Sequence, residues 1–419
     1  MAAIVNNDTL ALQLERVRTK LPQLFERDNV FFAKVARKGE KVSSRSMRVP
    51  LYLRPGGRGG LYDPNGGNMG RGTGSKYEVA TVTPAHFKFG VEINKLVEMA
   101  TNSGEKAIEN AAKAEVKNSM AQFRAFLDKL CNRAATGILG TVSSFSTVTW
   151  TLTADTGFLP SAKFHVGQGL HVSDLTNTRT GTPVVVSIDD ANNKIVVDAN
   201  PTGLANADTI AIEGSVAAGG AITSIALQGI PYHQSSATSG TWQGLTRSAT
   251  ALPEVITPSV NASSASLTTT HIRLAKNKIR LALGAQAVGN LVAYVHPAQM
   301  HAYEDLGIVI SQINKGASSD EGLDLFFGEE NMRLDGTKPL VSINADKTRI
   351  DFLNLESWGR CVMEEIDFFN IGDTKTFAPY TNGAPDAAEL FYLTTSFQLV
   401  NDNPRKGSFI SSLAVPTGY

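Results

Sequence analysis

The longest uninterrupted helical pattern in the chain is NSGEKAIENAAKAEVKNSMAQFRAFLDKLCNRAATG, residues 102–137. Asn102 and Glu105 have the spacing of a helix N-cap and its capping-box partner, and no further glycine or proline occurs before Gly137. Apolar residues recur at spacings of three and four, as on one face of an amphipathic helix: Ile108, Ala112, Val116, Met120, Phe123, Leu127, Leu130 and Ala134. We predict a helix over about 104–136, roughly 45 Å long at about 1.5 Å per residue, which suits a scaffold strut.

A long β-hairpin is predicted before this helix, over 45–95. Apolar and polar residues alternate in 47–54 and again in 87–93, which is the pattern of half-exposed strands. Between them, the segment GGRGGLYDPNGGNMGRGTG at 56–74 contains nine glycines and cannot pack a core of its own. The basic residues around it are Arg54, Arg58, Arg71 and Lys76. We therefore expect a hairpin with a flexible, basic tip.

Residues 141–215 have the pattern of a small all-β domain. Strand candidates such as TVTWTLT (147–153), TPVVVSID (182–189) and KIVVDA (194–199) are separated by turn clusters, and no helical pattern intervenes. This spacing predicts a small β-barrel or sandwich inserted between the flanking elements. The 33 residues from Gly214 to Thr246 then contain no Asp, Glu, Lys or Arg, which is typical of a linker or of a surface covered by neighbours.

The remainder of the chain mixes helix and strand. An amphipathic helix is predicted over 268–283, followed by a buried strand at LVAYVHP (291–297) and a short helix over 298–306. The C-terminal part, 351–419, is rich in strand patterns. The expected fold class is α+β.

Charge is balanced overall, with 39 Lys and Arg against 39 Asp and Glu, but it is divided along the chain. From Glu15 to Arg58 there are twelve basic and four acidic residues, whereas His301 to Glu365 has six basic and thirteen acidic residues. The zero net charge excludes a strongly basic DNA-binding protein. Opposed patches of this kind favour head-to-tail contacts between identical chains, although solvated faces of an ordinary globular protein also explain them.

The composition indicates a cytoplasmic, soluble product. The two cysteines, Cys131 and Cys361, are far apart and form neither a disulfide framework nor a thiolate metal site, which favours a reducing compartment. No run approaches the roughly 18 to 20 apolar residues of a membrane span. The N-terminal residues also lack the features of a secretory signal.

We find no motif for catalysis, for a cofactor or for a metal ion. The glycines of 56–74 lead into another strand rather than into a helix N-terminus, so a phosphate-binding loop is not expected. The seven histidines show no metal-ligand spacing, and neither cysteine has the context of a nucleophile. The basic tip could contact nucleic acid, but Tyr62 and Tyr77 are its only aromatic residues, and a neighbouring acidic subunit explains it equally well.

The order of these parts resembles the HK97-fold major capsid proteins of tailed double-stranded DNA bacteriophages. The parts are a basic N-terminal arm, a glycine-tipped hairpin, one long helix, a mixed domain with a second amphipathic helix, and a β-rich end that closes with FQLVNDNPRKGSFISSLAVPTGY (397–419). The resemblance implies six regions: an N-terminal arm (1–40), an extended loop (41–98), the spine helix of the peripheral domain (99–140), an inserted β-barrel-like domain (141–215), an axial domain that includes the second peripheral helix at 268–283 (216–350), and the C-terminal β-rich part of both domains (351–419).

The resemblance also implies a function and partners. Copies of the chain would assemble as hexamers and pentamers into an icosahedral or prolate head that encloses phage DNA without sequence-specific contacts. A separate scaffolding protein, a portal and possibly a decoration protein are the other partners implied. No enzymatic activity and no membrane contact are expected. Assembly would take place in the host cytoplasm.

Contacts between subunits are expected to join the basic hairpin to acidic residues of a neighbour. The residues predicted to make them are Arg54, Arg58, Tyr62, Arg71 and Lys76 on the basic side, and Glu329, Glu330, Glu364 and Glu365 on the acidic side.

Three alternatives stay open at this point. The same fold could enclose an enzyme, as in an encapsulin-like compartment. The block at 141–215 could instead make the chain a β-rich adhesive or carbohydrate-binding protein, although Trp150, Phe158 and Phe164 in that block are better explained as core residues. An unrecognised enzyme is the third alternative.

Overall fold

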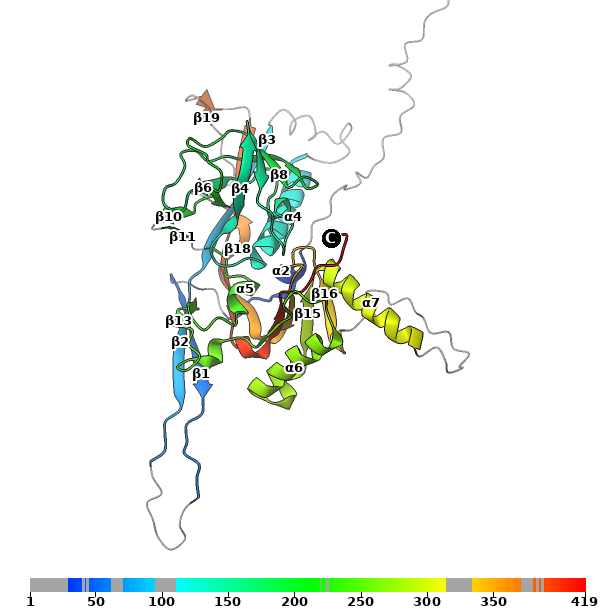
Figure 1. The fold of residues 1–419 in the computed structure, drawn as a ribbon. Helices are drawn as coiled ribbons and strands as arrows, with labels where there is room; N and C mark the ends of the chain where they lie inside the picture. The colour runs from blue at the N-terminus through cyan, green and yellow to red at the C-terminus, as the bar shows by residue number, and fades with distance from the viewer. Residues whose placement is uncertain are drawn as a thin grey trace, which may run out of the picture. The chain divides into compact units, whose positions relative to one another are not determined.

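The computed structural model describes residues 29–39, 42, 45–61, 71–94, 111–218, 220–223, 226–313, 334–370, 380–381, 384–385 and 388–419 (Figure 1). These residues belong to two compact units. The described part of the smaller unit is 88–94, 111–123, 367–370, 380–381, 384–385 and 388–394; the remaining described residues form the larger unit.

Helix α4 (Ala111–Cys131) is the long helix predicted from the sequence. Its predicted first turns, 104–110, lie outside the described residues. The helix ends at Cys131, five residues before the predicted end, because its last turn tightens: the amides of Asn132 and Arg133 bond to the carbonyls of Lys129 and Leu130 at 3.3 and 3.1 Å. A turn then leads to Gly137, whose φ of 71° suits glycine.

Strands β3 (Ala85–Asn94), β18 (Trp358–Phe368) and β21 (Ala388–Asn401) form a three-stranded sheet in the order β18-β21-β3. Within the smaller unit, Phe89 packs on Phe123 of α4 with ring centroids 5.6 Å apart, and Phe368 packs on Phe391 at the same distance. Aromatic pairs of this kind stabilise the fold by more than the apolar area they bury.

The predicted hairpin has a different second strand. Strand β1 (Met47–Arg54) pairs antiparallel with β2 (Lys76–Val82), with Met47 opposite Val82 and Tyr52 opposite Tyr77. The predicted strand at 87–93 exists as part of β3, but it pairs with β21 in the other sheet. The prediction overlooked the alternation in KYEVATV (76–82), which places the turn of the hairpin between 54 and 76.

A closed barrel occupies residues 138–212 of the larger unit. Its strands are β4 (Ile138–Ser146), β5 (Thr149–Leu152), β6 (Leu170–Ser173), β7 (Val185–Asp189), β8 (Lys194–Val197) and β9 (Thr209–Ile212), in the order β6-β9-β4-β5-β8-β7. The two outer strands also meet, since the Leu170 amide donates to the Pro183 carbonyl at 2.9 Å and the Val185 amide to the Gln168 carbonyl at 3.0 Å. Trp150, Phe164 and Ile195 lie in a core built from the barrel's own residues.

A five-stranded sheet organises the rest of the larger unit. Its order is β14 (Ser259–Asn261), β22 (Ser408–Ser411), β17 (Ile350–Asn354), β15 (Leu291–Val295) and β16 (Lys338–Val341). Helices α6 (Thr269–Leu283) and α7 (Pro297–Ile313) cover one face, where alternate strand residues such as Ala293, Val295 and Ile350 share a core with them. On the opposite face Tyr294 packs against Phe31 of α2 (Val30–Lys34) with centroids 5.7 Å apart.

Both helices of this layer were predicted from the sequence, and the structure corrects the end of α7. Helix α6 matches its predicted range and begins at Thr268, whose hydroxyl accepts from the His271 amide at 3.3 Å. Helix α7 continues to Ile313 instead of stopping at Leu306, so Gly307 does not end it.

The uncharged stretch from Gly214 to Thr246 is not a linker where the structure describes it. It contains short elements, and Trp242 and Leu245 pack under the hairpin. The short elements of the larger unit are β10 (Val216–Ala218), β11 (Ala221–Thr223), α5 (Ile230–His233), β12 (Thr241–Trp242), β13 (Leu245–Thr246) and the 3₁₀ turns Ser161–Lys163, Pro253–Val255, Ala285–Val288, Leu355–Ser357 and Pro404–Lys406. In the smaller unit, β19 (Tyr380–Thr381) pairs with β20 (Ala384–Pro385).

Candidate inter-subunit surfaces

The inner face of the β1–β2 hairpin is fixed to its own chain. Leu51 and Ala80 pack with Trp242, Leu252 and Val255 in one buried cluster. The Thr81 amide also donates to the carbonyl of Gln243 at 2.8 Å. The base of the hairpin is therefore held by apolar packing and by the backbone.

Two of the predicted contact residues, Arg54 and Lys76, form hydrogen bonds within their own chain. Both donate to the Ala251 carbonyl at 3.0 Å, and Arg54 Nε lies 3.1 Å from Glu254 Oε1. Arg54 and Lys76 are register partners at the end of the paired strands. Their side chains thus fasten the end of the paired strands to residues 251–254 of the same unit.

Beyond these two residues, the basic residues are exposed. The Gly57 amide donates to the Thr73 carbonyl at 2.8 Å and Thr73 Oγ1 donates to the Gly57 carbonyl at 3.0 Å, which extends the pairing towards the tip. Arg58 and Arg71 are exposed, and within the described residues neither has a hydrogen bond or ion pair. The predicted contact residue Tyr62 lies outside the described residues.

The outer face of the hairpin carries an apolar stripe that the sequence analysis did not recognise. Pro50 stands opposite Val79 and Tyr52 opposite Tyr77 in the register, and all four are exposed. The two tyrosine rings lie 5.0 Å apart and are 57% and 67% exposed. A contiguous group of exposed apolar residues is a candidate contact surface. The strict alternation in 47–54 was the signal that could have identified it.

The predicted acidic residues are only partly described. Glu364 is exposed on β18, and Glu365 lies 4.0 Å from Arg360, whose own Nε donates to the Val35 carbonyl at 2.9 Å. Glu329 and Glu330 lie outside the described residues. Among the described residues, neither Glu364 nor Glu365 forms an ion pair with Arg54, Arg58, Arg71 or Lys76 within one copy.

The cysteines and histidines of the described residues are not grouped as metal ligands. Among these residues, no three His, Cys, Asp or Glu side chains are placed to hold a metal ion. Burial raises the pKa of the Cys361 thiol to about 11 and that of Cys131 well above its ordinary value, so both thiols are protonated at neutral pH. Burial, followed by the charge of Arg247, lowers the pKa of His233 to about 3.

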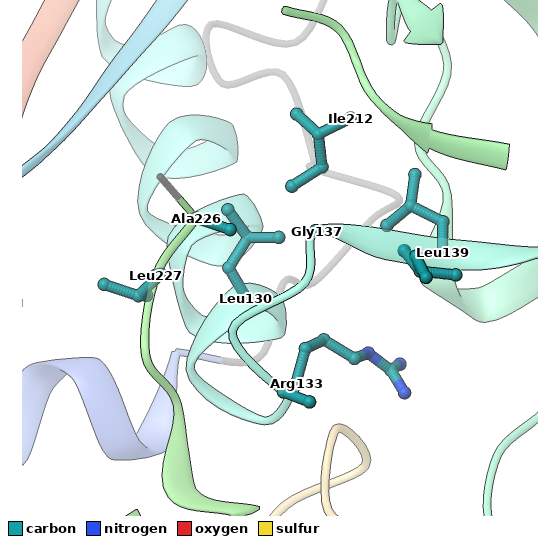
Figure 2. Close-up of a pocket in the computed structure, with 9 residues that line it drawn as sticks. Leu130, Arg133, Gly137, Leu139, Ile212, Ala226 and Leu227 are labelled. Carbon is teal, nitrogen blue, oxygen red and sulfur yellow. The ribbon is translucent and has the colours of Figure 1, made fainter. Parts of the chain in front are cut away.

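Two cavities were considered as ligand sites. The first, between α4, β4 and β9, has a volume of about 10 Å³ and is lined by apolar side chains such as Leu130, Leu139 and Ile212 (Figure 2). It has room for about one water molecule. The second is an open hollow of about 400 Å³ on the barrel, where Arg179 is held by Asp208 at 2.7 Å. His171 and Glu213 also line this hollow.

In the described part of the chain, none of the helices combines the length and the apolar character that crossing a membrane would need.

The fold is shared with solved capsid structures. The chain in the structure titled "Cyanophage A-1(L) capsid asymmetric unit" is 11% identical with a TM-score of 0.59, and the match covers 98% of this chain and 99% of that one. The chain in "Capsid of native GTA particle computed with C5 symmetry" is 10% identical with a TM-score of 0.50, and the match covers 98% of this chain and 100% of that one. No protein-family model and no curated protein matches the sequence. The chain has the α+β, HK97-like fold of phage major capsid proteins.

Proposed function

We propose that the chain is a major capsid protein whose copies assemble, as hexamers and pentamers, into the closed head of a phage. The observation that carries this proposal is the hairpin: its inner face and base are fixed within the copy, while the tyrosine stripe and the tip arginines are left exposed. The fold it shares with the cyanophage capsid chain supports the same reading.

The hairpin is suited to contact a second copy. The inner face of this two-stranded ribbon is covered by its own chain, and a partner that covers the outer face would stabilise the ribbon further. Burial of a large apolar side chain stabilises a contact by roughly 1.5–3 kcal/mol. The exposed rings of Tyr52 and Tyr77 offer a second copy apolar area of this kind. Arg58 and Arg71 add charge that acidic residues of a neighbour, Glu364 among them, would complement.

The partners and location follow from this role. The chain acts in the virion without enzymatic activity, and assembly takes place in the bacterial cytoplasm with a separate scaffolding protein, a portal and a decoration protein as further partners. The zero net charge suits packaged DNA that is held by confinement and counterions.

The test is assembly of hairpin variants, observed by electron microscopy and by light scattering for particle mass. R58E/R71E should remove shells because the tip charge is reversed, whereas the control R58K/R71K retains the charge and should assemble. Y52S/Y77S should also impair assembly, whereas Y52F/Y77F keeps the rings and should assemble. Circular dichroism should be unchanged in all four. Normal shells from both R58E/R71E and Y52S/Y77S would contradict the proposed contact.

A further inference from the structure

Helix α6 has a second apolar face that its own chain leaves exposed. Its inner face places Ile272 and Ala275 in the core of the five-stranded sheet, and Ile279 on the same face is also buried. On the opposite side, Leu274 is 43% exposed and Leu281 is 85% exposed. These two leucines are seven residues apart and lie on one stripe of the helix. Exposed leucines at this spacing are typical of a helix that packs against something on both sides.

The exposed stripe is basic as well as apolar. Arg273 and Arg280 stand beside the two leucines, and the Arg273 side chain is 69% exposed. The four charged residues of α6 are all Lys or Arg, and the helix contains no Asp or Glu. Two of these four, Lys276 and Lys278, donate inward to backbone carbonyls of Leu334 and Ser259. Arg273 Nε lies 3.9 Å from Asp335 Oδ1 of its own chain, and Arg280 has no ion pair within the described residues. A partner of the outer face would therefore supply apolar area and further negative charge.

Helix α7 has the complementary character. It carries Glu304 and Asp305 and contains no Lys or Arg. Asp305 is 64% exposed, and its one close ionic neighbour in the described chain is His301, at 3.4 Å. Over 297–335 the sequence has eight acidic and two basic residues. The acidic character thus continues beyond α7 along the chain.

Within one copy the two helices lie in the same layer, and α7 does not cover the exposed leucines of α6. Both cover one face of the five-stranded sheet, and Figure 1 shows them diverging from β15. The turn at 334–337 ties them together: Lys276 Nζ donates to the Leu334 carbonyl at 3.2 Å, and the Asp335 amide donates to the Tyr303 hydroxyl at 3.2 Å. Each copy therefore presents one basic and one acidic helix, both bonded to the same turn.

We propose that the outer face of α6 in one copy packs on α7 of a second copy, head to tail around a ring. Two α6 faces would bring arginines against arginines, so a symmetric α6–α6 pair is disfavoured. A heterologous contact between a basic and an acidic face repeats from copy to copy and closes when the rotation allows it. The inference rests on the proposed capsid function and assigns the contact that builds each capsomer, separately from the hairpin.

A charge swap tests the pairing. R273E/R280E and E304K/D305K should each lower the yield of capsomers and shells at least tenfold in low salt, measured by sedimentation and electron microscopy of the full chain. Combining all four substitutions restores the opposite charges and should recover assembly. L274S/L281S alters only exposed leucines and should also lower the yield. Circular dichroism identifies any variant that fails to fold. Because Arg273 lies 3.9 Å from the exposed Asp335 of its own chain, R273E/R280E also changes a contact within the copy, and L274S/L281S tests the outer face independently of that contact.

The outcomes separate this inference from the proposed function. If the wild-type chain forms shells and both R273E/R280E and L274S/L281S do so equally well, the α6 contact is wrong and the capsid function stands. If the single reversals fail but the combined variant, folded, does not recover, α7 is not the partner. A wild-type chain that forms neither capsomers nor shells with or without a scaffolding protein would overturn both.

Discussion

The barrel at 138–212 and the hairpin at 47–82 are both antiparallel β structure, but they are stabilised in opposite ways. The barrel closes on itself and surrounds a core of its own residues, Trp150 among them. The hairpin has two strands, and its buried residues pack on Trp242 and its neighbours from another part of the chain. A closed sheet has no free edges and needs no partner, whereas an open ribbon depends on what covers it. We infer that the hairpin, and not the barrel, is the element built for assembly.

The largest expected effects come from the two fully buried tryptophans, one in each region. Trp150 and Trp242 both have 0% exposure, so replacement of either by alanine should cost about 3–5 kcal/mol of unfolding free energy. W150A should loosen the barrel alone, because Trp150 contacts only barrel residues in its core. W242A should loosen the hairpin and impair assembly.

Hydrogen exchange of peptides from 138–212 and 47–82 distinguishes the two variants. If W242A leaves exchange in 47–82 unchanged, the packing dependence assigned to the hairpin is incorrect. If W150A increases exchange in both regions, the barrel is not self-sufficient.

The second effect is on acid stability. His233 is buried beside Tyr232, which packs against the cluster of Leu51, Ala80 and Trp242 under the hairpin. Burial is the main cause that lowers the pKa of His233 to about 3. The native state holds His233 neutral while the unfolded chain takes up a proton below about pH 6.5, so stability should fall as the pH is lowered from about 6.5 towards 3. The maximum slope is about 1.4 kcal/mol per pH unit for one such group.

Urea unfolding between pH 7 and pH 4 checks this prediction. H233Q removes the titrating group and should flatten the pH dependence. The matched control is H171Q in the barrel, because burial also lowers the pKa of His171. H171Q should leave the hydrogen exchange of peptides near the hairpin unaltered. An unchanged slope in H233Q would show that other groups carry the acid sensitivity.

The smallest effects compare two ion pairs. In the barrel, Asp208 is 2% exposed and accepts from Arg179 at 2.9 and 2.7 Å, and this bond raises the pKa of Arg179. At the hairpin, the Arg54–Glu254 pair is more open, since the Arg54 side chain is 45% exposed. D208N should therefore lower the melting temperature clearly, whereas E254Q should cost less than about 1 kcal/mol.

Salt provides the control for this pair of variants. At 1 M salt the Debye length falls to about 3 Å, so the effect of E254Q should nearly vanish while that of D208N persists. If the two variants are equally sensitive to salt, the Arg179–Asp208 pair of the barrel is no better shielded from solvent than the Arg54–Glu254 pair of the hairpin.

Local patterns in the sequence were sufficient to locate helices α4 and α6. The three-and-four spacing located α4, and Thr268 marked the start of α6, because both signals depend on neighbours along the chain. The partner of β1 was missed because pairing is a long-range choice: β3 has the same alternation as β2, but it joins β21, about 300 residues away.

The contact surfaces were less predictable than the fold. Arg54 and Arg58 look alike in the sequence, yet Arg54 bonds to Ala251 and Glu254 while Arg58 is exposed. Which basic residue is available depends on a turn almost 200 residues further along the chain. The alternation in 47–54 indicates that Tyr52 is on the outer face, but its position opposite Tyr77 follows from the register of β1 with β2.

Cryo-electron microscopy of particles assembled from the full chain would examine the hairpin contact itself. We expect closed shells in which the ribbon at 47–82 lies on an adjacent copy, with Tyr52 and Tyr77 covered and Arg58 and Arg71 near acidic residues of that copy. A small closed oligomer, or a shell in which both tyrosines face solvent, would contradict the assignment of the hairpin as the assembling element.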